Sequence, residues 1–403
     1  MAHNLRIAIE CRITDGRQGV GSAILALARA LSNSGTTEQE YTFIVRESLQ
    51  EWLAPYIYGP CRLEGIPDPA ISGVKKALRW AAPLRYIWHQ YCDRTSYAPA
   101  SDGLVESRHF DVVHFVTQAA YLTDLPSIYQ PHDLQHLHYP QFFSKSDFAQ
   151  RERLYRAFCK QASFVCVQTQ WTKLDVIRQY AIADEKVVVI PWGSVFDAYK
   201  TPSREEIDST IEKYRLPSQF FFYPAATWAH KNHEAIFRAI QILKRESGIA
   251  PHVFFTGAST EYRPTLDKLA LELGVSEQAH FLGFVTPSEL QAIFKTATAM
   301  IYASKFEGFG LPLLEAFHAR LPVLSSNATT LPEVGRNGAL YFDPDSPEEL
   351  AALMKEVLDR PEIRQDLIDK GEAVLAQFSF RDTAAMFQAL YERTAVLHAD
   401  RPM

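Results

Sequence analysis

Two glutamates, Glu307 and Glu315, stand on either side of a Gly-Phe-Gly-Leu-Pro turn. Gly308 and Gly310 allow a backbone with positive φ that approaches a ligand closely. Pro312 suits the first turn of a helix, whose free N–H groups favour a phosphate. A carboxylate can accept two hydroxyl hydrogen bonds from a vicinal diol. A strand–turn–helix connection with two surface glutamates would explain the separate residues. The whole string favours a site where one glutamate binds a sugar and the other a ribose.

A lysine suited to phosphate occurs earlier, in the segment Tyr-Pro-Ala-Ala-Thr-Trp-Ala-His-Lys-Asn-His that ends at His233. Lys231 is a point charge that could neutralise a departing diphosphate. The alternative is a solvated helix start with Asn232 near its cap. Beside the glutamate pair, the phosphate role is favoured.

Length and composition limit the kinds of protein that could hold these residues. With 403 residues, 47% apolar and 22% charged, the chain is predicted to form two globular domains of similar size. A net charge of −6 argues against a dedicated nucleic-acid binder. We find no apolar window long enough to span a membrane and no signal peptide. Five cysteines without a CxxC pair indicate reduced, mostly buried thiols in a cytoplasmic protein.

Short apolar segments alternate with helical ones along the whole chain, which predicts two doubly wound α/β domains in tandem with a central cleft. We expect about six strands in the first half, at 5–10, 41–45, 111–116, 127–129, 163–168 and 186–190. We expect six more at 220–223, 252–255, 280–282, 299–302, 322–325 and 339–342. The predicted domains are 1–198 and 199–379, with the last helix, 380–403, packing back on the first domain.

The Glu307…Glu315 pair, with its intervening turn, resembles the E-x7-E signature of the retaining glycosyltransferase family 4. The resemblance covers most of the chain. It implies the GT-B fold, in which two Rossmann-like domains face an active site. It also implies that Glu315 binds the nucleotide ribose. Glu307, as a catalytic residue, would then hold the donor sugar and phosphates together with the amides of Gly308, Phe309, Gly310 and Leu311.

Other donor contacts follow from the same resemblance. Lys231 would be catalytic, acting on the phosphates with Thr227 and Asn232 beside it. Many members carry an arginine earlier in this loop, and this chain has none there. Thr227, His230 or an arginine from elsewhere could replace it. The remaining predicted donor contacts are Gly19 and Gly21 in an N-terminal glycine loop, and the backbone of Phe284 and Val285 at the base.

A tight turn between strand and helix is the less favoured alternative for the glycine loop. Asn327 and 331–334 resemble the family's next loop on the nucleotide side.

A histidine-rich segment, Gln-Pro-His-Asp-Leu-Gln-His-Leu-His, follows the strand at 127–129. By resemblance, His132 is a catalytic residue near the donor sugar and the acceptor. His132, Asp133, His136 and His138 also suggest a metal site. We favour no metal or other cofactor, because GT-B enzymes usually need none and no thiolate accompanies the histidines. His136 and His138 would line the acceptor side or simply pack.

Residues 72–91 mix Lys and Arg with Trp and Tyr. This pattern fits a peripheral contact with anionic lipid and fits a packed insertion equally well. If it contacts a membrane, we expect a lipid-linked sugar acceptor and a place on the cytoplasmic face.

The predicted function is retaining transfer of a hexose from a nucleotide-diphosphate sugar to a glycan or lipid-linked acceptor, in polysaccharide or glycoconjugate synthesis. GDP-mannose is the first choice of donor, and UDP-glucose-type donors come next. Two other classes stay open. One is a dinucleotide-dependent oxidoreductase, suggested by the opening strand, glycine loop and helix. The other is a non-catalytic protein that binds sugar nucleotides.

Overall fold

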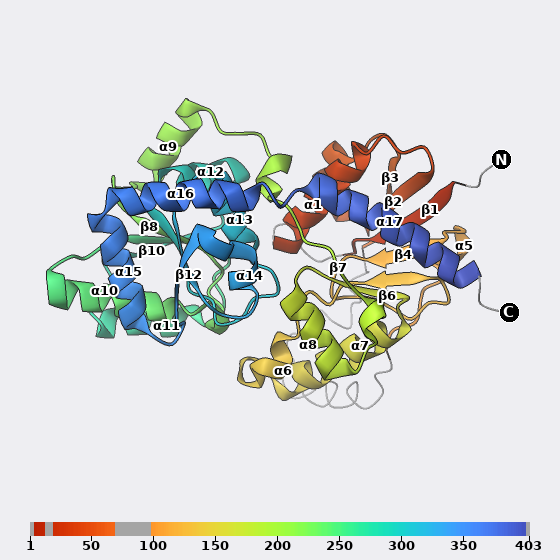
Figure 1. Cartoon of the computed structure of the whole chain (residues 1–403), viewed down its shortest axis with the longest axis horizontal. Coiled ribbons are helices and arrows are strands. Elements are labelled where there is room, and N and C mark those ends of the chain that lie inside the picture. Colours follow the sequence, from red (N-terminus) through yellow and green to blue (C-terminus); the bar gives the residue numbers. More distant parts are fainter. Residues whose placement is uncertain (1–3, 13–18, 69–97, 400–403) are drawn as a thin grey trace, which may run out of the picture. The chain divides into compact units, whose positions relative to one another are not determined.

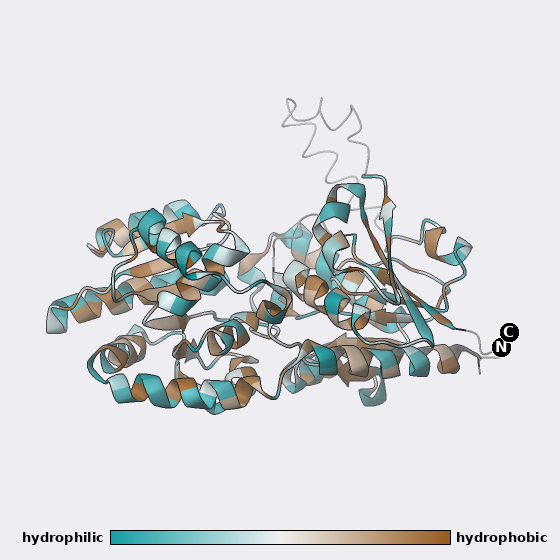
Figure 2. Cartoon of the chain, turned by 90° about the horizontal axis from the view of Figure 1, so that it is seen from above, coloured by the Kyte–Doolittle hydropathy of each residue, from teal (hydrophilic) through white to brown (hydrophobic). Residues whose placement is uncertain are grey.

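A computed structural model describes residues 4–12, 19–68 and 98–399 of the chain (Figure 1). These residues form two compact units. The first comprises Met1–Val167, Lys173–Ile190 and Thr383–Met403, and the second Gln168–Thr172 and Pro191–Asp382, apart from the residues not described. Each unit contains one parallel sheet with helices packed on it. Figure 2 shows that the helices carry both hydrophilic and hydrophobic stripes, as expected for helices that cover a sheet.

The sheet of the first unit has seven parallel strands in the order β3-β2-β1-β4-β5-β6-β7. The order reverses direction between β1 and β4, which are paired neighbours. Ligands of such sheets bind at this point, beyond the carboxyl ends of the strands. The strands are β1 (Leu5–Glu10), β2 (Gln39–Arg46), β3 (Cys61–Ile66), β4 (Val112–Phe115), β5 (Ser127–Tyr129), β6 (Phe164–Val167) and β7 (Val187–Val189).

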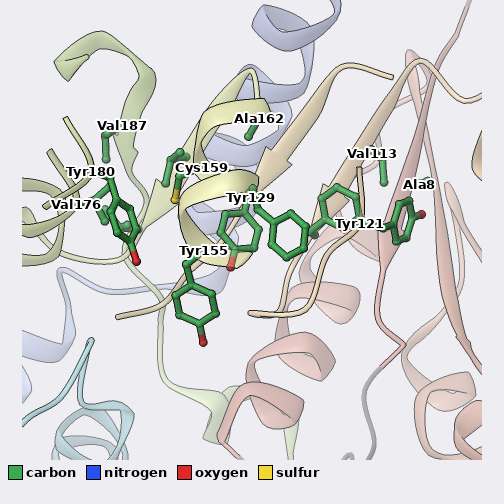
Figure 3. Packing of buried hydrophobic residues seen from close by; sticks show 14 of the residues in the cluster. Ala8, Val113, Tyr121, Tyr129, Tyr155, Cys159, Ala162, Val176, Tyr180 and Val187 are labelled. Carbon is green, nitrogen blue, oxygen red and sulfur yellow. The ribbon is translucent and has the colours of Figure 1, made fainter. Parts of the chain in front are cut away.

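Aromatic and aliphatic side chains pack together in a buried cluster of the first unit, as Figure 3 shows. Tyr129 on β5 lies 5.4 Å from Phe158 and 6.4 Å from Tyr155, centroid to centroid, with the rings edge to face. The helices here are α1 (Gly19–Ser32), α2 (Gln50–Leu53), α5 (Leu104–Ser107), α6 (Gln135–His138), α7 (Lys145–Gln161), α8 (Gln170–Tyr180) and α17 (Phe380–Ala399).

The C-terminal helix α17 belongs to the first unit from Thr383 onward. Its Tyr391 is fully buried and makes a hydrogen bond of 2.9 Å with His114 on β4. Phe387, one turn earlier, places its ring 4.7 Å from the His114 ring. Gln39 on β2 also donates to the α17 backbone at Gln388. The last helix is therefore held by buried polar and aromatic contacts to two strands.

The second unit has a sheet of six parallel strands in the order β10-β9-β8-β11-β12-β13. The strands are β8 (Phe221–Pro224), β9 (Val253–Thr256), β10 (Ala279–Gly283), β11 (Ala299–Tyr302), β12 (Val323–Ser326) and β13 (Ala339–Phe342). The helices are α9 (Arg204–Tyr214), α10 (His233–Ser247), α11 (Arg263–Glu272), α12 (Pro287–Thr296), α13 (Leu311–His318), α14 (Leu331–Gly335), α15 (Pro347–Asp359) and α16 (Pro361–Leu375). All six predicted strands of this half are present.

The structure differs from the sequence-based expectation in the first unit. The edge strand β3 was not predicted, because its residues Cys-Arg-Leu-Glu-Gly-Ile are only partly buried and lack a clear apolar pattern. Gly19 and Gly21 lie in the first turn of α1, where a loop was expected. Four cysteines are buried free thiols, as predicted. Residues 72–91 and Cys92 lie outside the described residues.

We expect Tyr391→Phe to lower the free energy of unfolding by about 1–3 kcal/mol, because it leaves a buried His114 nitrogen without its partner. Urea denaturation measures the change. Tyr58→Phe is the matched control, since Tyr58 is 43% exposed and should change stability little. Equal stability of Tyr391→Phe and the parent protein would contradict the proposed anchoring of α17.

Candidate functional site

The loop between β11 and α13 carries the glutamate pair. Phe306 and Phe309 are buried and fix the loop against the second unit. Gly310 has φ of 102°, and a Cβ there would lie 2.7 Å from the side chain of Leu331. The left-handed φ of Gly310 is the conformation that the sequence analysis expected a glycine of this turn to adopt.

Two threonines that the sequence analysis missed hold the same loop. The Thr329 hydroxyl accepts a hydrogen bond of 3.1 Å from the Glu307 amide and donates one of 2.9 Å to the Glu307 carbonyl. The Thr330 hydroxyl also reaches that carbonyl, at 3.1 Å, and the Phe309 carbonyl at 3.3 Å. A pair of threonines after a strand carries no distinctive signal in the sequence. Their effect is to fix the backbone from which Glu307 projects.

Lys231 and Glu307 form an ion pair of 2.5 Å between Nζ and Oε1, with the side chains 19% and 14% exposed. Lys231 ends a short 3-10 turn, Ala229–Lys231, after β8. Its carbonyl accepts a hydrogen bond of 2.8 Å from buried Tyr223. Burial alone would raise the pKa of Glu307, but the charge of Lys231 outweighs burial, and the net pKa is lowered. Glu307 is therefore ionised at neutral pH.

Asn232 connects two loops. It has φ of 58° and stands at the N-cap of α10, where the alternative placed it, but its side chain makes no capping hydrogen bond. Its Nδ2 instead donates to the carbonyls of Ala303, at 3.1 Å, and Pro344, at 2.7 Å. Asn232 therefore positions the residue before it, Lys231, against the strand that precedes Glu307.

Glu315 lies in α13, is 9% exposed, and has no hydrogen bond or ion pair to its carboxylate among the described residues. Burial raises its pKa to about 7. Tyr302, the last residue of β11, connects it to the rest of the site. Burial and the nearby carboxylates of Glu307 and Glu315 raise the pKa of Tyr302, and Lys231 Nζ lies 5.9 Å from the centre of its ring. Glu307, Glu315 and Lys231 therefore surround one buried tyrosine that the sequence analysis did not select.

The loops after β8, β9 and β10 lie together. Thr227 is buried, and its hydroxyl accepts the Thr260 amide at 2.8 Å. The amide of Gly257 donates to the carbonyl of Gly283, directly before Phe284 and Val285. Phe284 is 54% exposed, so its ring extends into solvent at this edge of the sheet.

Burial, followed by the charge of Lys231, lowers the pKa of His230 to about 3. His230 is therefore neutral at pH 7.

The predicted histidines belong to the first unit, whereas Lys231, Glu307 and Glu315 belong to the second. His132 is buried after β5 with φ of 63°, and its Nε2 lies 3.1 Å from the Val116 carbonyl. His136 packs among aromatic rings, and His138 makes a hydrogen bond of 2.8 Å with Asp175. Within residues 4–12, 19–68 and 98–399, no three His, Cys, Asp or Glu side chains gather as a metal site would require.

Two family descriptions match the sequence. "Glycosyl transferases group 1" matches residues 203–374 and "Glycosyltransferase Family 4" matches residues 17–194. The chain belongs to glycosyltransferase family 4. The predicted family is thereby confirmed, and membership of this enzyme family decides against the dinucleotide-dependent oxidoreductase.

Relatives of this glycosyltransferase include O-antigen chain mannosyltransferase B of Escherichia coli, which is 26% identical over 62% of this chain and 66% of its own. Serotype-specific mannosyltransferase WbdA of Escherichia coli is 32% identical over 56% of this chain and 28% of its own. The alignments thus span about two thirds or less of the length of these relatives.

Solved structures confirm the predicted GT-B fold. Anabaena HepE in complex with UDP and glucose superimposes with a TM-score of 0.70 at 17% identity, covering 96% of this chain and 99% of that one. WaaG, a glycosyltransferase involved in lipopolysaccharide biosynthesis, superimposes with a TM-score of 0.64 at 15% identity. The superposition covers 97% of this chain and 99% of WaaG. Among the described helices, none is long and apolar enough to cross a bilayer.

We expect Gly310→Ala to lower the free energy of unfolding by about 2–4 kcal/mol, because the new Cβ combines a strained φ with a clash at Leu331. Gly274→Ala is the matched control: its φ is 67°, but open space surrounds it. The control should cost about 1–2 kcal/mol, from backbone strain alone. Chemical denaturation compares the two, and an equal cost would show that the loop tolerates the clash.

The raised pKa of Glu315 predicts a pH-dependent stability. The folded protein keeps this proton up to about pH 7, whereas the unfolded chain loses it near pH 4.5, so stability falls as pH rises between these values and then levels off. Glu315→Gln should remove this loss. Its stability relative to the parent should therefore increase by about 3 kcal/mol from pH 4 to pH 8.

Urea denaturation across this pH range measures the difference. Glu277→Gln, at an exposed position, is the matched control and should follow the parent at every pH. A stability difference for Glu315→Gln that does not change with pH would contradict the raised pKa, because it would show that Glu315 has the same pKa in the folded and unfolded states.

Proposed function

We propose that this protein transfers mannose from GDP-mannose to a hydroxyl of a glycan or lipid-linked acceptor, with retention at the anomeric carbon. Several relatives named as mannosyltransferases, 25–34% identical, support the mannosyl part. They include O-antigen chain and serotype-specific enzymes, which supports a role in polysaccharide synthesis. Because the alignments cover only part of those relatives, donor and acceptor are inferred from chemistry as well.

The Lys231–Glu307 pair is the observation on which the proposal rests. Breaking the bond between sugar and phosphate leaves negative charge on a diphosphate, and fixed positive groups lower the energy of that state. Lys231 uses one N–H on Glu307, which leaves two for phosphate oxygens. The N-terminus of α13, with the amides of Gly308–Leu311, supplies further donors on the same loop. The protein's own groups thus supply the positive charge, and we propose that no metal is needed.

The two glutamates would bind different hydroxyl groups of the donor. Glu307 is ionised and can accept hydrogen bonds from the hexose while Lys231 holds the phosphate. Glu315 would bind the ribose diol. Because hydroxyl donors favour a carboxylate in its charged form, nucleotide binding would lower the raised pKa of Glu315 and release its proton.

Retention would proceed by attack of the acceptor on the face that the phosphate leaves, with the phosphate taking the acceptor's proton. This step needs no protein nucleophile. His132 would hydrogen-bond the donor sugar or the incoming acceptor. Gly19, Gly21, Thr227 and Asn232 would shape the donor site.

The backbone of Phe284 and Val285 would contact the nucleotide base. Because no side chain makes this contact, the residue types do not distinguish guanine from uracil. UDP-glucose is the second candidate donor, supported by solved neighbours of the same fold in complex with UDP-glucose. We further propose that the protein acts at the cytoplasmic face of a membrane, where a lipid-linked acceptor would be reached.

The full-length protein tests this function in a donor panel. We expect turnover of GDP-mannose in preference to UDP-glucose, and unchanged turnover in EDTA. Lys231→Met should weaken GDP binding about 10- to 100-fold, since it removes a charge-assisted contact. Lys268→Met, at a position 78% exposed, is the matched control. Glu307→Gln should lower kcat about 100-fold or more while changing GDP affinity little.

Equal GDP affinity in Lys231→Met and Lys268→Met would contradict the phosphate role. GDP binding without turnover, against every acceptor tried, would favour a non-catalytic sugar-nucleotide binding protein. Preference for UDP-glucose would replace the donor and leave the site intact.

A further inference from the structure

A pocket of about 260 Å³ opens in the first unit, at the carboxyl ends of β1, β2 and β4. Its position is the point where the strand order of the sheet reverses direction, between β1 and β4. This is where open parallel sheets bind ligands. None of the residues selected from the sequence lines it. The pocket therefore needs an explanation separate from the donor site.

Arg12 and Glu10 form the polar wall. The Arg12 guanidinium donates to both oxygens of Glu10, from Nε at 2.7 Å and from Nη2 at 2.6 Å. Its Nη1 donates to Asp102 at 2.7 Å. The side chains of Arg12 and Glu10 are only 13% and 5% exposed. The guanidinium is thus held rigidly at the end of β1.

Hydrogen-bonding capacity remains on this wall. A guanidinium has five N–H groups, and Arg12 uses three of them in these contacts, so two are left. Asp102 accepts from Arg12 and from the Leu104 amide, yet its side chain is 54% exposed and has further lone pairs. Donors and acceptors therefore lie side by side, which matches a hydroxyl group, since a hydroxyl both donates and accepts.

The other wall is apolar. Tyr121 is 9% exposed, its ring packs edge to face on Phe115 at 4.8 Å, and its hydroxyl donates to Glu10 at 3.1 Å. Pro99 and three alanines, at positions 100, 119 and 120, complete this side. A sugar has such a double character, with C–H faces that pack on apolar groups and hydroxyls at its edge.

Charge and size narrow the class of ligand. Two carboxylates, Glu10 and Asp102, balance two guanidiniums, Arg12 and Arg46, so the described lining residues carry no net charge. An anion such as a phosphate would gain little there. Because drug-sized ligands occupy about 300–1,000 Å³, this smaller pocket suits about one sugar ring.

We propose that this pocket is a subsite for a neutral sugar unit, whose hydroxyls bind Arg12 and Asp102 while one face of the ring packs on Pro99 and the three alanines. The proposal rests on the proposed function, because a transferase that extends a glycan must hold a sugar besides its donor. Arg12 acts here as a binding residue and Glu10 as a positioning residue, which fixes the guanidinium plane.

A purely structural role is the competing explanation. Arg12 would then only tie the loop around Asp102 to β1. The two explanations predict different sugar binding for a variant that fills the pocket but keeps the hydrogen bonds of Arg12 to Glu10 and Asp102. Ala119 offers this test, since it lines the pocket, is exposed and makes none of the side-chain contacts of Arg12.

The experiment uses the full-length protein, with mannobiose as the probe and saturation-transfer NMR as the readout. Ala119→Phe should weaken mannobiose binding at least about tenfold and leave the melting temperature and the GDP affinity unchanged. Ala54→Phe, at another exposed position of the first unit, is the matched control and should bind mannobiose as the parent does. Asp102→Ala should also weaken mannobiose binding with little effect on GDP.

Parent-like mannobiose binding by Ala119→Phe would overturn the subsite, as would the absence of saturation transfer from the parent protein. Tighter binding of mannose 6-phosphate than of mannose would overturn the neutral character of the ligand. GDP affinity, measured in the same samples, reports on the proposed function separately. A parent protein that binds mannobiose but no sugar nucleotide would overturn that function and leave the subsite standing.

Discussion

The ion pair between Lys231 and Glu307 is the interaction on which the proposed donor site depends. The two residues lie 76 positions apart and follow β8 and β11, which are paired neighbours in the sheet. Parallel pairing brings the ends of both strands to one edge, so the lysine of one loop meets the carboxylate of the other. A carboxylate with so little exposure would bind a proton if it stood alone. Lys231 keeps it charged, and in turn gains a fixed position with N–H groups to spare.

Glu315 shows what the same residue type becomes without such a partner. It lies one loop away, yet burial raises its pKa to about 7, whereas the pKa of Glu307 is lowered. Both carboxylates act on Tyr302. When the surroundings of two neighbouring acids give them different pKa values, the two acids commonly have different roles in catalysis or binding. Here the charged acid stands beside the proposed phosphate-binding lysine, and the acid of raised pKa lies within the helix that follows.

The first unit uses the same property of parallel sheets in a different way. The reversal of strand order between β1 and β4 leaves a hollow beyond their ends, and a nearly buried arginine lines it. Burying a guanidinium is unfavourable unless carboxylates surround it. Glu10 and Asp102 supply this compensation. The result is a neutral wall of hydrogen-bonding groups, unlike the charged pair of the second unit, and the two surfaces suit different parts of a glycosyl transfer.

The sequence by itself determined the two sheets, because alternating buried strands and helices leave a strong local pattern. It also determined the family, because Glu307 and Glu315 stand in one dense motif and Lys231 in a second, separate one. Only the tertiary structure decided the surroundings of these groups. These surroundings include the threonines that hold the Glu307 backbone, the central Tyr302 and the Arg12 pocket, which join residues far apart in the chain. They also include the burial that keeps His230 neutral. Their pairing and burial depend on which strands become neighbours, and this long-range pairing has no local signature in the sequence.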